Sequence, residues 1–429
     1  MTARRPRHSV TPHIDGLHGT EFVSGLTGHH QSRLKEANRA LVLRVLMRGP
    51  RSRRNVARAT GLTSAAITNI VGHLVNEGMV IETGEDRTNT SVYGGRPAIT
   101  LDLNPDGPFV LGAQVGVTEA VIARANLRGA VQESVTIPLS GRVTPEEFVD
   151  RCRSAADRLS SRQRILGLGV GIAGVVETDK GHLVSMPQLG WQDVPLRQLL
   201  EARFRWPIAI DNNVSAMALA ELLLGGPNLL GGDFCFVYVG NIVRAALVLH
   251  GDLYRGHSHA AGQIGHLQVE DNGTECICGR RGCLETIIGD SAFTSRARRA
   301  AEHRGQSAVG KTLESTTDTR TIVSRIAELA IEGDALATDL MNEKARALAR
   351  AMAVTSDVVD PPAFVVASSI RDDLQWDWLA RITRAFDQDA NLLKERRSQV
   401  IATTFGAAAP IVAACALALR GVFQPRRYG

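Results

Sequence analysis

The sequence predicts an α/β protein in which a small basic helical module precedes a large body of two lobes. Residues 1–100 hold 14 Lys and Arg against 7 Asp and Glu, whereas the other 329 residues hold 35 against 37. Helical periodicity dominates residues 33–77, and beyond residue 108 short apolar runs alternate with longer helical patterns. With 429 residues, of which 44% are hydrophobic, the chain is long enough for more than one domain.

The ends of the chain carry little sign of targeting. Residues 1–30 mix Arg, His, Gly, Thr and Pro without periodicity, so we predict a disordered tail. They contain no apolar segment typical of a secretory signal. The longest apolar run, Ala407–Leu419, is interrupted by a proline and is too short to cross a bilayer. Cys152, Cys235 and Cys415 lie among apolar neighbours, as expected of reduced thiols, so we predict a cytoplasmic protein without a membrane partner.

Three helices are predicted near the N-terminus. Helical spacing of Leu and Val predicts the first over residues 33–48. Ser52 can cap a second helix, Arg53–Thr60, because its side chain can accept a hydrogen bond from a first-turn amide. Thr63 can cap a third, Ser64–Glu77, in the same way, and glycines follow both helices where a left-handed residue commonly ends one. Two short helices joined by Gly-Leu-Thr are typical of a helix-turn-helix.

The third helix has a polar face. Its apolar side chains share one side, which leaves Ser64, Thr68 and Asn69 on the other, and such a face can enter a major groove. We expect Asn69 to pair with an adenine edge. The phosphate contacts predicted for the second helix are Arg53, Arg54 and Arg58. A plain three-helix bundle would show the same helices, but the basic excess favours DNA binding.

A wing is predicted after the third helix. Met79–Thr83 and Ser91–Tyr93 could pair as strands around a polar tip. Arg87 and Arg96 are then placed to reach the DNA backbone or the minor groove. We therefore predict a winged helix-turn-helix domain over residues 31–100 that binds double-stranded operator DNA.

The rest of the chain has the pattern of an α/β body. The predicted strands are Phe109–Val117, Ile165–Ile172, Ile208–Ile210, Phe234–Val239, Ala245–Leu249 and Ala363–Ala367, and the predicted helices are Pro145–Leu159, Val214–Leu224 and Ala335–Val358. No solenoid period is present in the sequence. A body of this length suggests two α/β lobes around a cleft.

A cysteine cluster lies in the second half of the body. Cys276, Cys278 and Cys283 fall within eight residues, and His266 lies ten residues upstream of the first. Zinc prefers four such ligands in a tetrahedron, and the two interleaved glycines would allow the tight turn. Four protein ligands leave no open coordination position, so we predict a structural Zn²⁺ ion. A chance cluster is the alternative, and the glycines and the histidine count against it.

These motifs together resemble the ROK family (repressor, open reading frame, kinase). The resemblance is carried by the helix-turn-helix, by Gly94-Gly95-Arg96-Pro97, and by the AGxxGH and CxCGxxGCLE patterns within Ala260–Glu285. It implies a two-lobed actin-like, ribonuclease-H-like body over residues 108–429 that binds a sugar or sugar derivative. One lobe would span about 108–225 plus the C-terminal helix, and the other about 226–405. The DNA module indicates the regulator branch, and a palindromic operator would require a homodimer or homotetramer.

The chain departs from the sugar kinases of this family at four places. The phosphate loop Asp-x-Gly-x-Thr reads Gln114–Thr118 here, the glycine-rich loop reads Gly240–Arg244, and a Gly-Gly pair is replaced by Ala367–Ser368. The catalytic base position holds Asn213, whose amide cannot accept a proton, and losing a general base costs about 10²- to 10⁴-fold in rate. We therefore predict no catalytic residue, no ATP binding and no enzyme activity.

The resemblance also assigns six effector contacts. The retained positions are Asn212, His266 and Glu285, and the substituted ones are Asn213, Gln188 and Gln263. At Asn213 and Gln263 an amide replaces a carboxylate, which adds a donor and removes a charged acceptor. Either the cleft binds a different ligand, such as a modified or anionic sugar, or it is losing ligand binding. His266 would also link the ligand to the zinc ion.

The sequence thus predicts a DNA-binding transcriptional regulator, a repressor of carbohydrate-related genes whose body senses a sugar-like effector. Two alternatives stay open. One is a bifunctional sugar kinase that also binds DNA, and the other is a regulator whose body answers to a protein partner.

Overall fold

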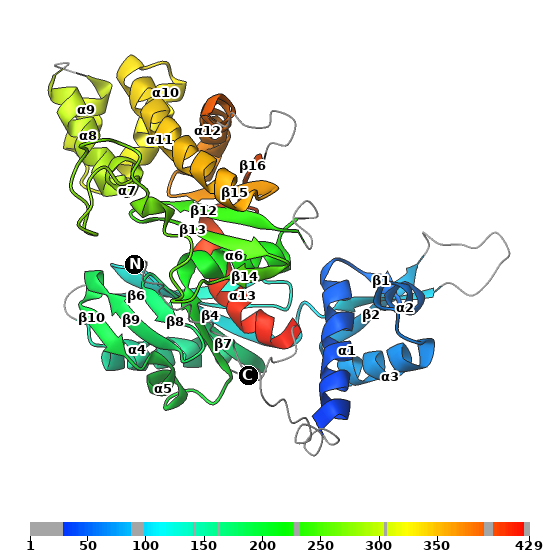
Figure 1. Cartoon of the computed structure of the whole chain (residues 1–429). Helices are drawn as coiled ribbons and strands as arrows, with labels where there is room; N and C mark the ends of the chain where they lie inside the picture. The colour runs from blue at the N-terminus through cyan, green and yellow to red at the C-terminus, as the bar shows by residue number, and fades with distance from the viewer. Residues whose placement is uncertain are drawn as a thin grey trace, which may run out of the picture.

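The computed structural model describes residues 29–86, 98–139, 143–161, 163–226, 232–303, 307–389 and 398–423. A small module lies beside a body of two lobes stacked on one another (Figure 1). Helix α1 (His29–Met47) opens the described chain. His29 and His30, which the sequence assigns to a disordered tail, are therefore helical, and the rest of that tail lies outside the described residues.

The N-terminal module contains the three predicted helices. After α1 come α2 (Arg53–Thr60) and α3 (Ser64–Asn76). The side-chain oxygen of Ser52 accepts from the amide of Asn55 at 3.4 Å, and that of Thr63 accepts from the amide of Ala66 at 3.2 Å. Both helix starts are thus capped as the sequence predicts.

The small sheet of this module contains a strand that was not predicted, Ala98–Leu103. Strand β2 (Val80–Asp86) pairs antiparallel with β3 (Ala98–Leu103), and β1 (Arg51–Ser52) joins the other edge of β3. The other predicted strand of the wing, Ser91–Tyr93, lies outside the described residues, so its pairing with Met79–Thr83 stays a prediction. Leu101 and Leu103 of β3 are fully buried, and burying two inward side chains on one strand stabilises this pairing. The sheet continues to Leu103, beyond residue 100, where the predicted domain ends. The boundaries of the domains stay predictions.

The two lobes repeat one sheet topology. In lobe one the order is β11-β7-β4-β5-β6, and in lobe two it is β14-β13-β12-β15-β16; in each, a three-stranded antiparallel meander is extended by two parallel strands. The strands of lobe one are β4 (Phe109–Val115), β5 (Glu119–Ala125), β6 (Val131–Pro138), β7 (Ile165–Ile172) and β11 (Ile208–Asn212). Those of lobe two are β12 (Phe234–Val239), β13 (Val243–Leu249), β14 (Asp252–Tyr254), β15 (Ala363–Ser368) and β16 (Gln399–Ala402).

Helices cover these sheets. Lobe one carries α4 (Pro145–Ser160), α5 (Leu196–Glu201) and a small antiparallel sheet of β8 (Val175–Glu177), β9 (His182–Met186) and β10 (Trp191–Val194). Lobe two carries α7 (Glu285–Ile288), α8 (Asp290–Glu302), α9 (Ala308–Ser315), α10 (Thr319–Ile331), α11 (Ala335–Val359) and α12 (Gln375–Asp389). All predicted strands and helices of the body are present, with ends within two residues. Strand β6 was missed because most of its side chains are exposed and it therefore lacks the apolar run of a buried strand.

Two apolar helices fill the space between the lobes: α6 (Asn213–Leu224) and α13 (Ala409–Phe423). The segment Gly406–Phe423 is long and apolar enough to span a membrane, contrary to the prediction that this run is too short, but 56% of it is buried inside the fold. Packing against β4, β7 and α6 accounts for its apolar character. Glycines on the strands allow this approach, since a Cβ at Gly169 would lie 1.9 Å from the carbonyl oxygen of Ala414.

Gly169→Ala is therefore expected to lower the free energy of unfolding by about 1–3 kcal/mol or more, because the strand or α13 must move to admit the methyl group. Chemical denaturation would measure the loss. Gly72→Ala on α3, where a Cβ meets open space, is the matched control and should be neutral or stabilising by about 0.5–1 kcal/mol. Equal stability of the two variants would contradict the packing described.

The N-terminal module is docked on lobe one through α1. Its Leu43 and Leu46 share a hydrophobic core with Leu419 and Phe423 of α13. Arg128, in the turn after β5, donates to the carbonyl oxygens of Met47 at 3.0 Å and Leu46 at 3.3 Å, which satisfies the C-terminus of α1. The module is thus tied to the helix that lies between the two lobes.

Candidate functional site

The outer face of α3 is polar and exposed. Ser64, Thr68 and Asn69 all lie on the surface, while the opposite face is buried against the module core. The Thr68 hydroxyl donates to the carbonyl oxygen of Ser64 at 2.9 Å, and its oxygen can still accept a hydrogen bond. The structure therefore brings the three predicted base-contacting residues together on one accessible helix face.

The arginines predicted to contact phosphates differ in their surroundings. Arg54 and Arg58 are exposed on α2. Arg53 Nη2 lies 2.7 Å from Glu82 Oε1 on β2, and both side chains are partly exposed. Such a surface ion pair contributes about 0–1 kcal/mol, so it would yield to a phosphate at little cost. Arg87 and Arg96 lie outside the described residues.

The four predicted metal ligands form one cluster. Nitrogen or sulfur atoms of His266, Cys276, Cys278 and Cys283 all lie within 4.8 Å of one another. Cys276 Sγ is 3.5 Å from His266 Nδ1, and Cys278 Sγ is 3.6 Å from Cys283 Sγ. Ligand atoms of a tetrahedral zinc ion lie about 3.5–3.8 Å apart, given Zn–S near 2.3 Å and Zn–N near 2.0 Å. The donor set and its spacing therefore fit one tetrahedral ion.

A tight hairpin builds this cluster. The amide of Cys276 donates to the carbonyl oxygen of Arg280 at 2.7 Å. Gly282 has φ +69°, and a Cβ there would lie 1.8 Å from the carbonyl oxygen of Glu270, so only glycine fits the turn. His266 reaches the same point from the short helix Ile264–His266, which follows the loop packed against β13.

The thiols of the cluster differ in acidity. Hydrogen bonds from Arg280, first from its backbone and then from its side chain, lower the pKa of the exposed Cys278 to about 6. Burial raises the pKa of Cys283 to about 12. The Cys283 thiol therefore ionises readily only beside a cation. A bound metal ion supplies that environment.

Two adjacent asparagines end β11 and begin α6. Asn212 caps the helix, because its Oδ1 accepts from the amide of Val214 at 2.9 Å, and its Nδ2 donates to the carbonyl oxygen of Gly174 at 2.8 Å. Asn213 is 8% exposed, and its Oδ1 is buried without a hydrogen-bond partner among the described atoms. An unsatisfied buried acceptor is costly, so this oxygen can receive a hydrogen bond from a bound molecule.

The other predicted effector contacts are distributed over both lobes. Gln188 of lobe one and Gln263 of lobe two are exposed, and His266 is half-buried. Glu285 Oε2 accepts from the amide of Val243 at 2.8 Å, at the start of β13. Glu285 is thus already engaged with the loop that carries Gly240–Arg244, and at Gly240 a Cβ would meet the Tyr238 ring at 2.7 Å.

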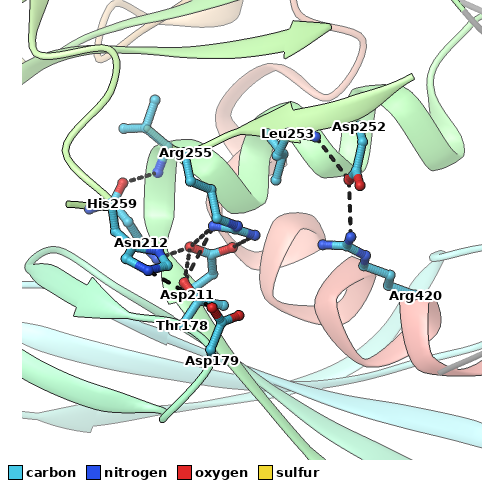
Figure 2. A network of polar contacts seen from close by, with 10 residues as sticks. Thr178, Asp179, Asp211, Asn212, Asp252, Leu253, Arg255, His259 and Arg420 are labelled. Atoms are coloured by element: carbon cyan, nitrogen blue, oxygen red, sulfur yellow. Dashed lines mark hydrogen bonds and ion pairs between the residues drawn. The ribbon is translucent and has the colours of Figure 1, made fainter. Parts of the chain in front are cut away.

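A cross-lobe ion pair is the feature that sequence reasoning missed. Asp211 of β11 is 2% exposed, and Arg255, which follows β14 in lobe two, donates to its Oδ1 at 3.0 Å and its Oδ2 at 2.7 Å. Figure 2 shows Arg255 reaching from lobe two to Asp211 beside Thr178. The Thr178 hydroxyl adds a third hydrogen bond, at 3.2 Å. The Asp211 carboxylate is therefore engaged by Arg255 and Thr178.

The repeated lobes and the added N-terminal module define the class of protein: an actin-like, kinase-fold body joined to a small helical module. Residues 110–420 match the model of the ROK family, and the chain belongs to this family. It is 29% identical over 274 residues to the xylose repressor of Caldicellulosiruptor bescii, and the aligned region covers 62% of this chain and 67% of that relative.

Two solved structures resemble the whole chain and the body. A ROK family transcriptional regulator, a homologue of the E. coli MLC protein, aligns with a TM-score of 0.76 at 22% identity, covering 91% of this chain and 97% of that chain. A ROK family glucokinase from Streptomyces griseus, crystallised with glucose and AMPPNP, aligns with a TM-score of 0.63 at 24% identity, covering 73% of this chain and 100% of that chain. The regulator covers more of this chain, by about the size of the N-terminal module.

Proposed function

We propose that this protein is a DNA-binding transcriptional repressor that acts in the cytoplasm and responds to a sugar-like effector. The observation that carries the proposal is the exposed polar face of α3, presented by a capped helix-turn-helix and a small antiparallel sheet. Two such helices, related by a two-fold axis in a homodimer or homotetramer, would read the half-sites of a palindromic operator. The repressor named among its relatives supports this use of the fold.

The His266, Cys276, Cys278 and Cys283 cluster holds a structural Zn²⁺ ion in this proposal. The ion supplies no chemistry, because four protein ligands close its coordination sphere. Its role is to fix the loop that carries Gln263 and His266 against β13. Since Nδ1 of His266 faces Cys276, the other ring nitrogen is left for a hydrogen bond to an effector.

The cleft residues Asn212, Asn213, Gln188, Gln263, His266 and Glu285 form the proposed effector site. The unsatisfied Oδ1 of Asn213 supports it, because a sugar hydroxyl is the natural donor for a buried amide oxygen. Amides at Asn213, Gln188 and Gln263 would bind hydroxyls without the strong charged acceptor that a carboxylate provides. A thermal-shift screen of sugars and sugar phosphates would identify the effector, and replacement of Asn213 by Ala should remove the shift.

Kinase activity is not expected. The catalytic position is Asn213, and the nearest carboxylate along the chain, Asp211, is held by Arg255 and Thr178. Without a general base, phosphoryl transfer to a sugar loses about 10²- to 10⁴-fold. A coupled assay with ATP and a panel of hexoses and amino sugars should therefore show no turnover. Sustained ADP release that depends on one sugar would establish the bifunctional alternative instead.

Substitutions on α2 and α3 should separate phosphate contacts from base contacts. Arg54→Gln is expected to weaken binding to all DNA sequences and to reduce the slope of log K against log salt by about 0.9. Asn69→Ala is expected to relax discrimination at one base pair by about 1–3 kcal/mol. Fluorescence anisotropy with operator variants at several salt concentrations would measure both.

Arg158→Gln is the control for these variants, because this exposed arginine lies on α4 of the body. It should leave affinity and salt dependence unchanged. If Arg54→Gln and Asn69→Ala give the same phenotype, the assignment of α3 as the base-reading helix is wrong.

A further inference from the structure

A large cavity lies where the N-terminal module meets both lobes. It has a volume of about 1070 Å³ and is bounded by the outer edges of β11 and β14, the turn after β8, the start of α5, the C-terminal end of α13, and α1. This volume lies just above the range of about 300–1,000 Å³ that is usual for small-molecule sites. None of the predicted effector contacts lines it, so it is separate from the proposed sugar cleft.

Four arginines line this cavity, each from a different part of the molecule. Arg44 comes from α1, Arg197 from lobe one, Arg255 from lobe two and Arg420 from α13. His250 and His257 also line it. Convergence of basic side chains from four structural units is unusual for a surface that binds only water, because like charges repel unless anions are near.

The carboxylates in the cavity do not neutralise all of these charges. Asp211 is held by Arg255 through two hydrogen bonds, and Asp252 accepts from Arg420 Nη2 at 3.0 Å, as Figure 2 shows. The third carboxylate, Asp179, is 86% exposed and is therefore screened by solvent. Because Asp211 and Asp252 pair with the other two arginines, no buried carboxylate remains among the described residues of the cavity to neutralise Arg44 and Arg197.

Arg197 and Arg44 both have capacity to bind a ligand. Arg197 Nη1 donates to the carbonyl oxygen of Ile208 at 2.9 Å, while its Nε is buried without a partner among the described atoms. Its contact to Glu201, at 3.7 Å, is to a half-exposed carboxylate. Within the described part of the chain, Arg44 makes no hydrogen bond or ion pair. Guanidinium groups of this kind bind phosphate and carboxylate oxygens in pairs.

We propose that this cavity is a second ligand site, specific for a small polyanion that carries phosphate or carboxylate groups, which bridges Arg44 of the DNA-binding module to Arg197 of the body. Because the ligand would contact α1 and lobe one at once, its binding would stabilise one position of the module relative to the body. The site would thus let an anionic metabolite adjust DNA binding independently of the sugar cleft.

Isothermal titration of the full-length, zinc-loaded protein at low salt tests this proposal, with pyrophosphate and citrate as probes and uncharged xylitol as the comparison. At least one anion should bind with a stoichiometry of one per chain, and xylitol should not reproduce it. Arg44→Gln and Arg197→Gln should each weaken anion binding on the order of tenfold or more, since each removes a charged hydrogen-bonding partner. Arg298→Gln, an exposed arginine on α8 far from the cavity in sequence, should bind as the unaltered protein does.

Absence of binding by both anions, or equal weakening by Arg298→Gln, would overturn the proposal. Weakening by Arg197→Gln alone would overturn the claim that the DNA-binding module takes part. Arg44 is exposed, so Arg44→Gln should fold as the unaltered protein does, and this variant keeps the test decisive if Arg197→Gln folds poorly. No DNA is present in the experiment, so its failure would leave the proposed repressor function untouched.

Discussion

Cys278→Ser is expected to abolish zinc binding and to lower the melting temperature of the protein sharply. Cys278 is exposed, and an exposed Cys-to-Ser change usually alters stability by less than about 0.5 kcal/mol. A large loss at this position can therefore come only from the metal. Structural zinc contributes on the order of 10 kcal/mol of coupled binding and folding energy, so loss of one ligand should loosen the whole loop against β13.

Metal content by mass spectrometry and a thermal melt would be measured on the same preparations. Cys152→Ser is the control: this thiol is buried in lobe one, away from the cluster. It should cost some stability but keep one zinc per chain. Full zinc content in Cys278→Ser together with an unchanged melt would contradict the proposed metal centre.

Asp211→Asn is expected to lower the free energy of unfolding by about 3–5 kcal/mol. The carboxylate is 2% exposed and Arg255 is 21% exposed, so the change strands a largely buried guanidinium without its counter-ion. The loss should appear as a lower denaturation midpoint. It should also loosen the junction between the lobes, because the pair joins β11 of lobe one to the segment after β14 of lobe two.

A double-mutant cycle tests whether this effect belongs to the pair. Asp211→Asn combined with Arg255→Met should be less destabilised than the sum of the two single changes, because no charge is then left unpaired. Glu147→Gln serves as the control, since Glu147 and Arg151 form an exposed pair one helical turn apart, which should be worth less than about 0.5 kcal/mol. If Asp211→Asn is as mild as Glu147→Gln, the cross-lobe pair contributes little.

Local features of this fold could be predicted from the sequence. Ser52 and Thr63 cap their helices because the capping signal lies within three residues of its partner amide. The Cys276–Cys283 loop closes for the same reason: its glycines and cysteines are neighbours in the chain. Buried strands such as β7 and β12 were predicted with the correct ends because both faces are covered and the apolar run is continuous.

Features that depend on distant segments could not be predicted. Nothing near Arg255 in the sequence indicates that it bonds Asp211, 44 residues away. The pairing of β2 with β3 was not predicted, because β3 is held in place by the burial of Leu101 and Leu103 in a core shared with helices of the module. The docking of α1 on α13 joins opposite ends of the chain, so the cavity lined by Arg44 and Arg420 exists only in the folded structure.

The most direct test of the proposed function is an equilibrium titration of the zinc-loaded protein with labelled DNA from upstream of its own gene, against a shuffled duplex of the same composition, at physiological salt. A repressor of this architecture should bind one segment at least about 10³-fold more tightly than the shuffled duplex. It should release that segment when its effector is added. Equal affinity for both duplexes at this salt concentration would contradict the proposal that α3 reads an operator.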